Sequence, residues 1–281
     1  MAEGVLHREA VRYAAPLREG GSLPAVVETE GGELFVVKFR GAGQGAPALV
    51  AELVVGLLAQ RLGLTVPDLA VVEVGEGFGR AEPDPEIQDI LRGSHGPNVG
   101  LRFLEGAFAY DPVAFADLVT PEEAADVVWF DALTLNVDRT PRNPNILVQD
   151  RRAWLIDHGA ALYLHHDWPG VTEERVRTAF ERIRDHVLLP RASSIAEADE
   201  RLAPRLTDDG IAEVLAAVPD TLLMDAPEGR HAPFPSAEEA RAAYHRLFAD
   251  RLRAPRVFAE EAERARVEVQ AARPRALDYR R

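Results

Sequence analysis

The chain has 281 residues, a length typical of one or two domains. Hydrophobic residues make up 47% and charged residues 28%, which is ordinary for a globular protein and excludes a collagen-like, coiled-coil or globally disordered chain. The net charge of −14 repels phosphate backbones, so no nucleic-acid partner is expected. Cysteine is absent, which excludes disulfides and thiolate chemistry. Segments 1–13 and 48–58 resemble neither a signal peptide nor a membrane span, so we expect a cytoplasmic protein.

The N-terminal part alternates predicted strands and turns around one long helix. The β-branched run 25–29 and the apolar run 34–39 are separated by a Gly-containing turn, which predicts an antiparallel hairpin. Pro47 opens a predicted helix that ends near residue 62, with Glu52 near the edge of its apolar face. The elements expected next are a strand at 69–74, a loop with one short helix at 75–98, and a strand at 99–104 that stops at Glu105.

Beyond residue 106 the pattern becomes helical, and we place the boundary between two lobes there. A helix is predicted from Pro121 to about residue 135, followed by a polar loop at 136–145 that two prolines interrupt. Two short β runs then flank a turn, and an Asp-His-Gly sequence follows the second run directly. Mostly helices are expected from residue 172 to the end. The β runs cover 146–148 and 153–156.

Lys38 is the only lysine in the sequence, and every other basic residue except histidine is arginine. A drift toward arginine codons accounts for this bias, yet the remaining ammonium group lies in a run typical of a buried strand. A buried charge without a partner costs several kcal/mol, so we expect Lys38 at a strand end or paired with an acid. Lysine and arginine are not interchangeable where a compact charge must reach a phosphate, which favours a functional interpretation.

Four features in chain order indicate one chemical site. They are a strand lysine, a helix glutamate, a loop with an aspartate and an asparagine, and an aspartate after a strand: Lys38, Glu52, Asp138 with Asn143, and Asp157. A nucleoside triphosphate carries several negative charges and binds Mg²⁺, for which a lysine together with carboxylate and amide oxygens is suited. A second aspartate is suited to accept the proton of an attacking hydroxyl group. This order of parts is that of protein-kinase-type phosphoryl transfer.

The chain resembles HipA-like kinases, a divergent branch of the protein-kinase-like superfamily. The resemblance lies in FVVKF at 35–39, ALVAELVVGLLAQRLGL at 48–64, NVDRTPRNPNILV at 136–148 and WLIDHGAAL at 154–162. It implies an α+β, two-lobed protein-kinase-like fold with a β-rich N-lobe at 1–106 and a mostly helical C-lobe at 107–281. It also implies ATP and Mg²⁺ as cofactors, and transfer of the γ-phosphoryl group to a hydroxyl acceptor, as in Ser/Thr protein kinases.

The resemblance implies a role for each residue of the site. Lys38 binds the ATP phosphates, Glu52 pairs with Lys38, Asp138 is the catalytic base, and Mg²⁺ is held by Asn143 and Asp157. A hinge that contacts adenine through its backbone is expected at Phe103, Leu104 and Glu105. A flap over the phosphates is expected at Gly20, Gly21 and Ser22.

The sequence departs from the usual kinase pattern at several positions. Asn136-Val137-Asp138 replaces the usual His-Arg-Asp triplet, and His158 stands where phenylalanine is common. Thr140 occupies a position where many kinases keep a lysine or histidine near the γ-phosphate, and Arg139 and Arg142 are the candidates for supplying that charge. These departures weaken the inference of a protein acceptor, and of the toxin role that some members of the family have, more than the inference of ATP binding.

Structural interpretations of the same residues remain open at this point. Glu52 can be an exposed helix carboxylate, Asp138, Asn143 and Asp157 can be ordinary turn residues, and Asn145 competes with Asn143 as the metal amide.

Alternative functions also remain open. A small-molecule kinase of the aminoglycoside-phosphotransferase type would use the same set of site residues, and a nucleotide-binding pseudokinase would act as a scaffold. A metal-dependent hydrolase would instead use the cluster His158, His165, His166 and Asp167. The acidic chain is not expected to dock on an anionic membrane. The acceptor, whether protein or small molecule, and the oligomeric state are not indicated.

Overall fold

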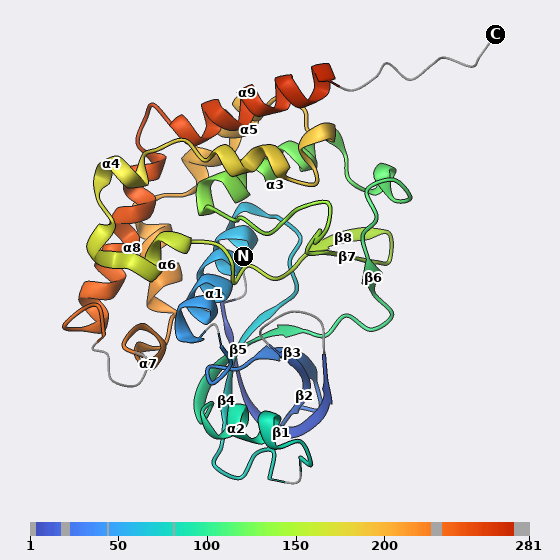
Figure 1. Cartoon of the computed structure of the whole chain (residues 1–281), viewed down its shortest axis with the longest axis vertical. Coiled ribbons are helices and arrows are strands. Elements are labelled where there is room, and N and C mark those ends of the chain that lie inside the picture. The colour runs from blue at the N-terminus through green and yellow to red at the C-terminus, as the bar shows by residue number, and fades with distance from the viewer. Residues whose placement is uncertain (1–3, 18–22, 44, 81, 226–231, 273–281) are drawn as a thin grey trace.

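The computed structural model places a strand-rich N-terminal part at one end of the molecule and a helical C-terminal part at the other (Figure 1). This arrangement confirms the expected mixed α and β architecture, with the strands concentrated before the helices. The structure describes residues 4–17, 23–43, 45–80, 82–225 and 232–272.

Five strands of the N-terminal part form a closed barrel in the order β1-β2-β3-β5-β4. Their bounds are β1 (Leu6–Pro16), β2 (Ala25–Thr29), β3 (Leu34–Lys38), β4 (Leu69–Val74) and β5 (Gly96–Arg102). Adjacent strands are antiparallel except β1 and β4, whose parallel pairing closes the sheet on itself. The sequence did not predict β1 or the closure, because β1 has no fully buried residue and its apolar pattern is therefore weak.

The pleat of β3 separates the barrel core from the face that carries Lys38. Phe35 and Val37 point into a core that also contains Ala25 and Val27 of β2. Because side chains alternate along a strand, Val36 and Lys38 lie on the opposite face, outside the barrel. Val26 of β2 pairs with Val36, so this outer face is apolar next to the lysine.

The strand expected at 99–104 begins and ends earlier than predicted, since β5 covers Gly96–Arg102. Gly96, Pro97 and Asn98 suggested a loop, but the Asn98 amide is fully buried and donates to the carbonyl oxygens of Ser94 and Gly96 at 2.8 and 2.9 Å. Its oxygen accepts from the Arg40 backbone at 2.8 Å. These bonds satisfy a polar side chain inside the barrel end, which sequence pattern alone does not reveal.

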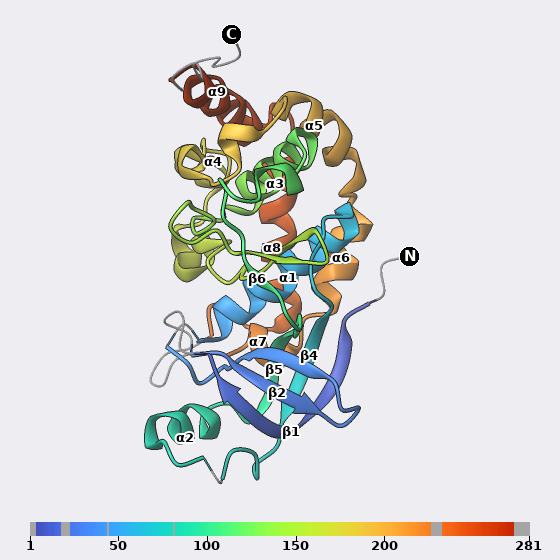
Figure 2. The ribbon, with the colours of Figure 1, turned by 90° about the vertical axis from the view of Figure 1, so that its right-hand side faces the viewer.

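The helix that carries Glu52 belongs to the core of the helical part as much as to the barrel. This helix, α1 (Gly45–Leu62), packs against α6 (Asp208–Ala216) and α7 (Asp220–Leu223) on one side and β4 and β5 on the other. In both views it lies between the barrel and the helices at the far end of the C-terminal part (Figures 1 and 2). One continuous hydrophobic cluster joins it to the C-terminal helices, so Glu52 is held from both sides.

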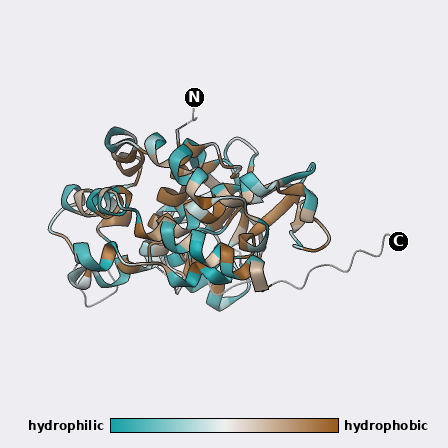
Figure 3. Cartoon of the chain, turned by 90° about the horizontal axis from the view of Figure 1, so that it is seen from above, coloured by the Kyte–Doolittle hydropathy of each residue, from teal (hydrophilic) through white to brown (hydrophobic). Residues whose placement is uncertain are grey.

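The other α-helices of the described chain complete the C-terminal part, apart from one that covers an end of the barrel. The latter is α2 (Pro85–Arg92), the short helix expected within 75–98. The C-terminal helices are α3 (Pro121–Thr134), α4 (Glu173–Val176), α5 (Ile195–Leu202), α8 (Ala237–Leu252) and α9 (Val257–Ala272). These helices carry both hydrophilic and hydrophobic residues (Figure 3), as expected for elements that bury one face.

Helix α3 begins and ends at residues that suit those positions. Thr120 and Glu123 form a capping box, in which each side chain accepts from the backbone of the other, and Pro121 occupies the first turn. The helix ends where Leu135 adopts a left-handed conformation with φ of 59°. The polar loop that starts at Asn136 is thereby directed away from the helix axis.

A small second sheet brings the polar loop and the Asp-His-Gly turn together. Its order is β6 (Phe108–Ala109), β7 (Ile146–Gln149) and β8 (Arg152–Leu155), so the expected hairpin is present. Asp150 and Arg151, the two residues between β7 and β8, both have positive φ, as a two-residue hairpin turn requires. Just beyond the hairpin, the Ile156 backbone donates to the Asn145 carbonyl oxygen at 3.0 Å.

Among the described helices, α1 is long and apolar enough to cross a membrane, but 78% of its span is buried inside the molecule. A helix buried in this way is typical of a protein core.

Candidate active site

Lys38 lies at the centre of a buried ion-pair cluster. Its Nζ donates to Glu52 Oε2 at 2.6 Å and also to Asp157 Oδ1. Lys38 is 8% exposed and Glu52 is fully buried, whereas the Asp157 side chain is 41% exposed. The structure thus brings together the strand lysine, the helix glutamate and the turn aspartate, and it leaves the aspartate open to solvent.

The electrostatics of this cluster keep Lys38 and Asp157 charged. Burial opposes the ammonium form of Lys38, but the carboxylates of Glu52 and Asp157 outweigh it and raise the pKa of Lys38. Burial likewise opposes the ionised form of Asp157, and the Lys38 ammonium group outweighs it, so the pKa of Asp157 is lowered. The cluster therefore presents an accessible carboxylate beside a fixed positive charge at neutral pH.

Backbone geometry at the Asp-His-Gly turn makes this close approach possible. Asp157 adopts a left-handed conformation with φ of 56°, which turns the chain sharply after β8. Gly159 then passes directly beside the lysine. A Cβ on Gly159 would lie 3.2 Å from Lys38 Nζ and 3.4 Å from the Ala48 carbonyl oxygen, so a side chain here would displace its neighbours.

In the polar loop, two side-chain amides donate hydrogen bonds to Asp138. Asp138 Oδ2 accepts from Asn143 Nδ2 at 2.8 Å and from Asn145 Nδ2 at 3.2 Å. The Asp138 backbone donates to Asn136 Oδ1 at 3.1 Å. Asn143 is exposed, whereas Asn145 is buried and has a positive φ of 48°. Both asparagines hold the aspartate, and Asn143 is the one whose side chain is accessible to solvent.

Arg139 connects this loop to the Asp-His-Gly turn through a buried network that the sequence did not indicate. Its guanidinium donates to Asp131 Oδ2 at 2.6 Å, to the Asn145 carbonyl oxygen at 2.5 Å and to the Ile156 carbonyl oxygen at 3.3 Å. Because Arg139 is 1% exposed and its donors are used in this way, it is not available to supply a charge to a phosphate. Of the two arginines, the exposed Arg142 remains the candidate for supplying a positive charge near the γ-phosphate.

Asp131 anchors the network within helix α3. It also accepts from Asn136 Nδ2 at 3.0 Å and lies 2.8 Å from His186 Nε2. Burial disfavours its charge, but Arg139 and His186 outweigh that effect and hold the pKa of Asp131 well below its usual range. The only sequence signal for this cluster was an acid on the apolar face of a predicted helix, and His186 gave none.

The hinge residues follow β5 rather than ending it. The Phe103 backbone donates to the Leu34 carbonyl oxygen at 2.8 Å, which ties the segment to β3. The Glu105 carbonyl oxygen accepts from Gln149 Nε2 at 2.7 Å, and the Leu104 carbonyl oxygen accepts from the Ala107 backbone at 3.2 Å. The flap residues Gly20, Gly21 and Ser22 lie outside the described residues.

The histidine cluster does not have the geometry of a metal site. His165 is buried with its Nδ1 3.0 Å from the Tyr244 hydroxyl oxygen, and Asp167 forms an ion pair with Arg175 at 2.8 Å. His158 contacts Arg139 instead of the other histidines. Within the ranges that the structure describes, no group of three or more histidine and acidic side chains could hold a metal ion. The hydrolase hypothesis therefore has no support here.

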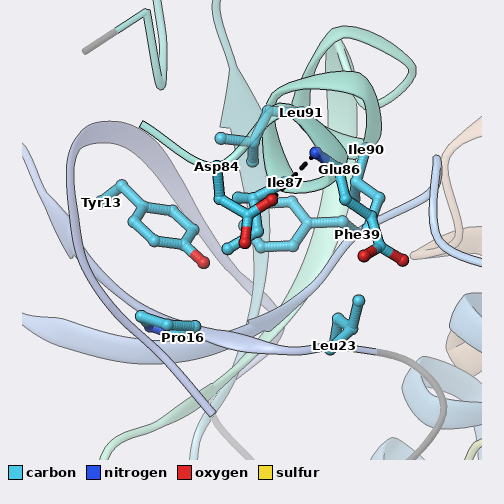
Figure 4. A pocket seen from close by; sticks show the side chains of 9 residues that line it. All are labelled: Tyr13, Pro16, Leu23, Phe39, Asp84, Glu86, Ile87, Ile90 and Leu91. Carbon is cyan, nitrogen blue, oxygen red and sulfur yellow. Dashed lines mark hydrogen bonds between the residues drawn. The ribbon is translucent and has the colours of Figure 1, made fainter. Parts of the chain in front are cut away.

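A separate cavity of about 240 Å³ opens at the end of the barrel (Figure 4). Its walls come from β1, the end of β3 and α2, and its lining does not include Lys38, Asp138 or Asp157. The carboxylates of Asp84 and Glu86 and the rings of Tyr13 and Phe39 are all part of its lining (Figure 4). The full lining is Tyr13, Pro16, Leu23, Phe39, Asp84, Glu86, Ile87, Ile90 and Leu91.

Comparison with known families adds a direct result. The family described as HipA-like kinase matches residues 11–232, which is most of the chain. The chain belongs to the HipA-like kinase family. No curated protein matches it.

Among solved structures, this HipA-like kinase is similar to a crystal structure of the Helicobacter pylori proinflammatory kinase CtkA. The TM-score is 0.51 at 13% sequence identity, and the match covers 94% of this chain and 99% of the other. At that identity the likeness shows a shared fold. The family and the fold together support a kinase, as the sequence motifs predicted.

Proposed function

We propose that this HipA-like kinase is an ATP-dependent phosphotransferase that moves the γ-phosphoryl group of Mg-ATP to a hydroxyl group, with Ser or Thr of a protein as the acceptor. The observation that supports this most directly is the shared ammonium group of Lys38, held by Glu52 and by the solvent-accessible Asp157. A structural ion pair has no need of a second, exposed carboxylate on the same amine.

The residues present fit a nucleotide and a divalent cation. Lys38 supplies the point charge for phosphate oxygens, and Glu52 fixes its direction from within the core. The Asp157 carboxylate and the exposed Asn143 amide provide oxygens of the kind that Mg²⁺ prefers. When bound, the cation neutralises negative charge on the phosphates.

Asp138 is suited to accept the proton of the acceptor hydroxyl group. Its Oδ2 is occupied by the amides of Asn143 and Asn145, and within the described residues no side chain or backbone group bonds its Oδ1. In the proposed reaction the hydroxyl oxygen forms a bond to the γ-phosphorus, the bond to the bridging oxygen of ADP breaks, and the hydroxyl proton passes to this carboxylate. The two amides hold the carboxylate in one orientation throughout.

The apolar face beside Lys38 is proposed to receive the adenine ring. Val26 and Val36 lie there on adjacent strands, and the hinge segment at Phe103, Leu104 and Glu105 begins where β5 leaves β3. The hinge backbone would supply polar contacts to the ring edge. Gly20, Gly21 and Ser22 remain the proposed flap, by their position between β1 and β2 in the chain.

The test measures phosphoryl transfer and nucleotide binding separately. Purified protein is incubated with γ-labelled ATP and Mg²⁺, alone and with a lysate, and the labelled products are identified by mass spectrometry. Binding is followed as the melting shift produced by Mg-ATP. We expect Lys38→Met to lose both, and Asp138→Asn to keep the melting shift while losing transfer by a factor of about 10²–10⁴.

Asp150→Asn is the matched control, because it makes the same change at the exposed turn of the hairpin, where asparagine tolerates the positive φ. It should retain both signals. A melting shift without transfer in the parent protein would indicate a pseudokinase, and labelled small molecules instead of protein would indicate a small-molecule acceptor. Equal transfer by Asp138→Asn and the parent would exclude the assigned base.

A further inference from the structure

His158 is a fully buried histidine in the Asp-His-Gly turn of the candidate active site. It follows Asp157, precedes Gly159, and is not exposed to solvent. Its Nδ1 lies 3.3 Å from Arg139 Nη2, so the same arginine that ties the polar loop to the Asp-His-Gly turn also contacts this ring. Most kinases place an apolar ring at this point, and the imidazole adds two polar atoms to be satisfied.

The arginine contact determines where the imidazole carries its proton. A guanidinium group can only donate, so Nδ1 must be the unprotonated, accepting nitrogen. An imidazole ring whose Nδ1 accepts a hydrogen bond carries a single proton. That proton is therefore on Nε2, and His158 has one N–H donor directed away from Arg139.

Two buried polar atoms near this point have no partner. Within the described residues, His158 Nε2 and Glu52 Oε1 are both buried side-chain atoms without a hydrogen bond. The histidine atom is a donor, because it carries the ring proton, and the glutamate atom is an acceptor, since Lys38 occupies only Oε2 of the carboxylate. The turn that carries His158 passes beside Glu52, since a Cβ on the next residue, Gly159, would lie 3.5 Å from Glu52 Oε2.

We propose that His158 is a positioning residue for Lys38: its Nε2–H donates through one buried water to Glu52 Oε1 and fixes the carboxylate that holds the lysine. A buried donor and acceptor with no other partner satisfy each other at low cost in this way. The result is one polar chain from Asp131 through Arg139, His158 and Glu52 to Lys38. It couples helix α3 to strand β3 across the site, and its effect on ATP use rests on the proposed function.

The first test observes the proton directly and needs no nucleotide. Long-range ¹⁵N–¹H NMR of the parent protein reports the tautomer of each histidine, and the resonance missing from His158→Gln assigns that of His158. We expect the Nε2–H tautomer with a strongly deshielded proton. An Nδ1–H tautomer would overturn the inference, whatever the kinetics show.

The second test compares two substitutions by the Michaelis constant for ATP. Glutamine has an oxygen that can accept from Arg139 and an amide that can donate to Glu52, whereas phenylalanine fills the space with neither. We expect His158→Phe to raise KM for ATP at least tenfold with less than a threefold change in kcat, and His158→Gln to stay within threefold of the parent. If His158 had a purely structural role, the activity of both variants would fall in proportion to their loss of melting temperature.

The two proposals fail in different ways. A parent protein that neither binds nor uses ATP contradicts the proposed function, while the NMR result still decides the hydrogen bond. A parent that uses ATP, with His158→Phe equal to it in KM, contradicts only the positioning role. If His158→Phe does not fold, the tautomer measured on the parent protein decides the proposal.

Discussion

Removing the positive charge of Lys38 leaves two carboxylates without their cation. In Lys38→Met the methionine fills a similar volume, but Glu52 is fully buried and its carboxyl group then has no cation in contact. Breaking a buried pair in this way typically costs about 3–5 kcal/mol. Asp157, which is partly exposed, retains solvent as an alternative partner, so the larger share of the cost arises at Glu52.

The expected shift in melting temperature follows from the size of the chain. At about 2.1 cal/mol/K per residue, unfolding of 281 residues has an entropy of about 590 cal/mol/K. Each kcal/mol therefore corresponds to roughly 1.7 °C, and Lys38→Met should melt about 5–8 °C below the parent. Differential scanning calorimetry without nucleotide measures this directly.

A double-mutant cycle separates the charge effect from packing. Glu52→Gln removes the carboxylate charge with little change of shape, so Lys38→Met combined with Glu52→Gln should recover most of the loss. The control is Arg142→Met, which removes an exposed charge and should change stability by less than about 0.5 kcal/mol. Two results would refute this reasoning: a melting temperature of Lys38→Met equal to that of the parent, or a double variant no more stable than Lys38→Met alone. Either would show that the unpaired carboxyl group of Glu52 is not what destabilises the protein.

Three further outcomes follow from the same structure. Arg139→Met should lower stability by about 3–5 kcal/mol in urea unfolding because it leaves Asp131 buried without its main cation, whereas Arg139→Lys should recover part of the loss. Gly159→Ala should raise KM for ATP about tenfold, since its Cβ would lie 3.2 Å from Lys38 Nζ, whereas Gly43→Ala, where a Cβ meets nothing within 4 Å, should match the parent in the same assay. Burial lowers the pKa of His165 from 6.5 to about 3, so the stability due to its neutral form is present above pH 6.5 and is lost as the pH falls toward 3. His165→Gln should therefore remove about 3 kcal/mol of the acid destabilisation at pH 4, seen as a flatter dependence of melting temperature on pH.

Local signals in the sequence were strong where side chains alternate or recur with a regular period. The strands at 25–29 and 69–74 have the predicted bounds, and the helix around Glu52 ends at the predicted residue. These segments bury most of their residues, so apolar periodicity reports them directly. β1 was missed for the opposite reason, since its residues are half-buried at most and one of its two partners, β4, lies far away in the chain.

The chemistry of the site could be predicted because each group is unusual in its own segment. A lone lysine in a buried strand requires a counterion, and the acids available in the following helix and after the hairpin supply it. The roles assigned to Asp138, Asn143 and the hinge remain predictions. Asn143 and Asn145 both hold Asp138, so spacing alone does not choose between them as the metal amide.

The sequence by itself determined which residue types are available for phosphate and metal chemistry, and in which order of strand, helix and loop they occur. The tertiary structure decided how they are held. Asp131, Arg139, His158 and His186 form the buried network behind the site. Arg139 and His158 lie in segments that the sequence predicts as loop or turn, and Asp131 and His186 in segments predicted to be mostly helical. Their partners are distant in the chain, and a polar residue is recognised as internal only when the fold shows which groups surround it.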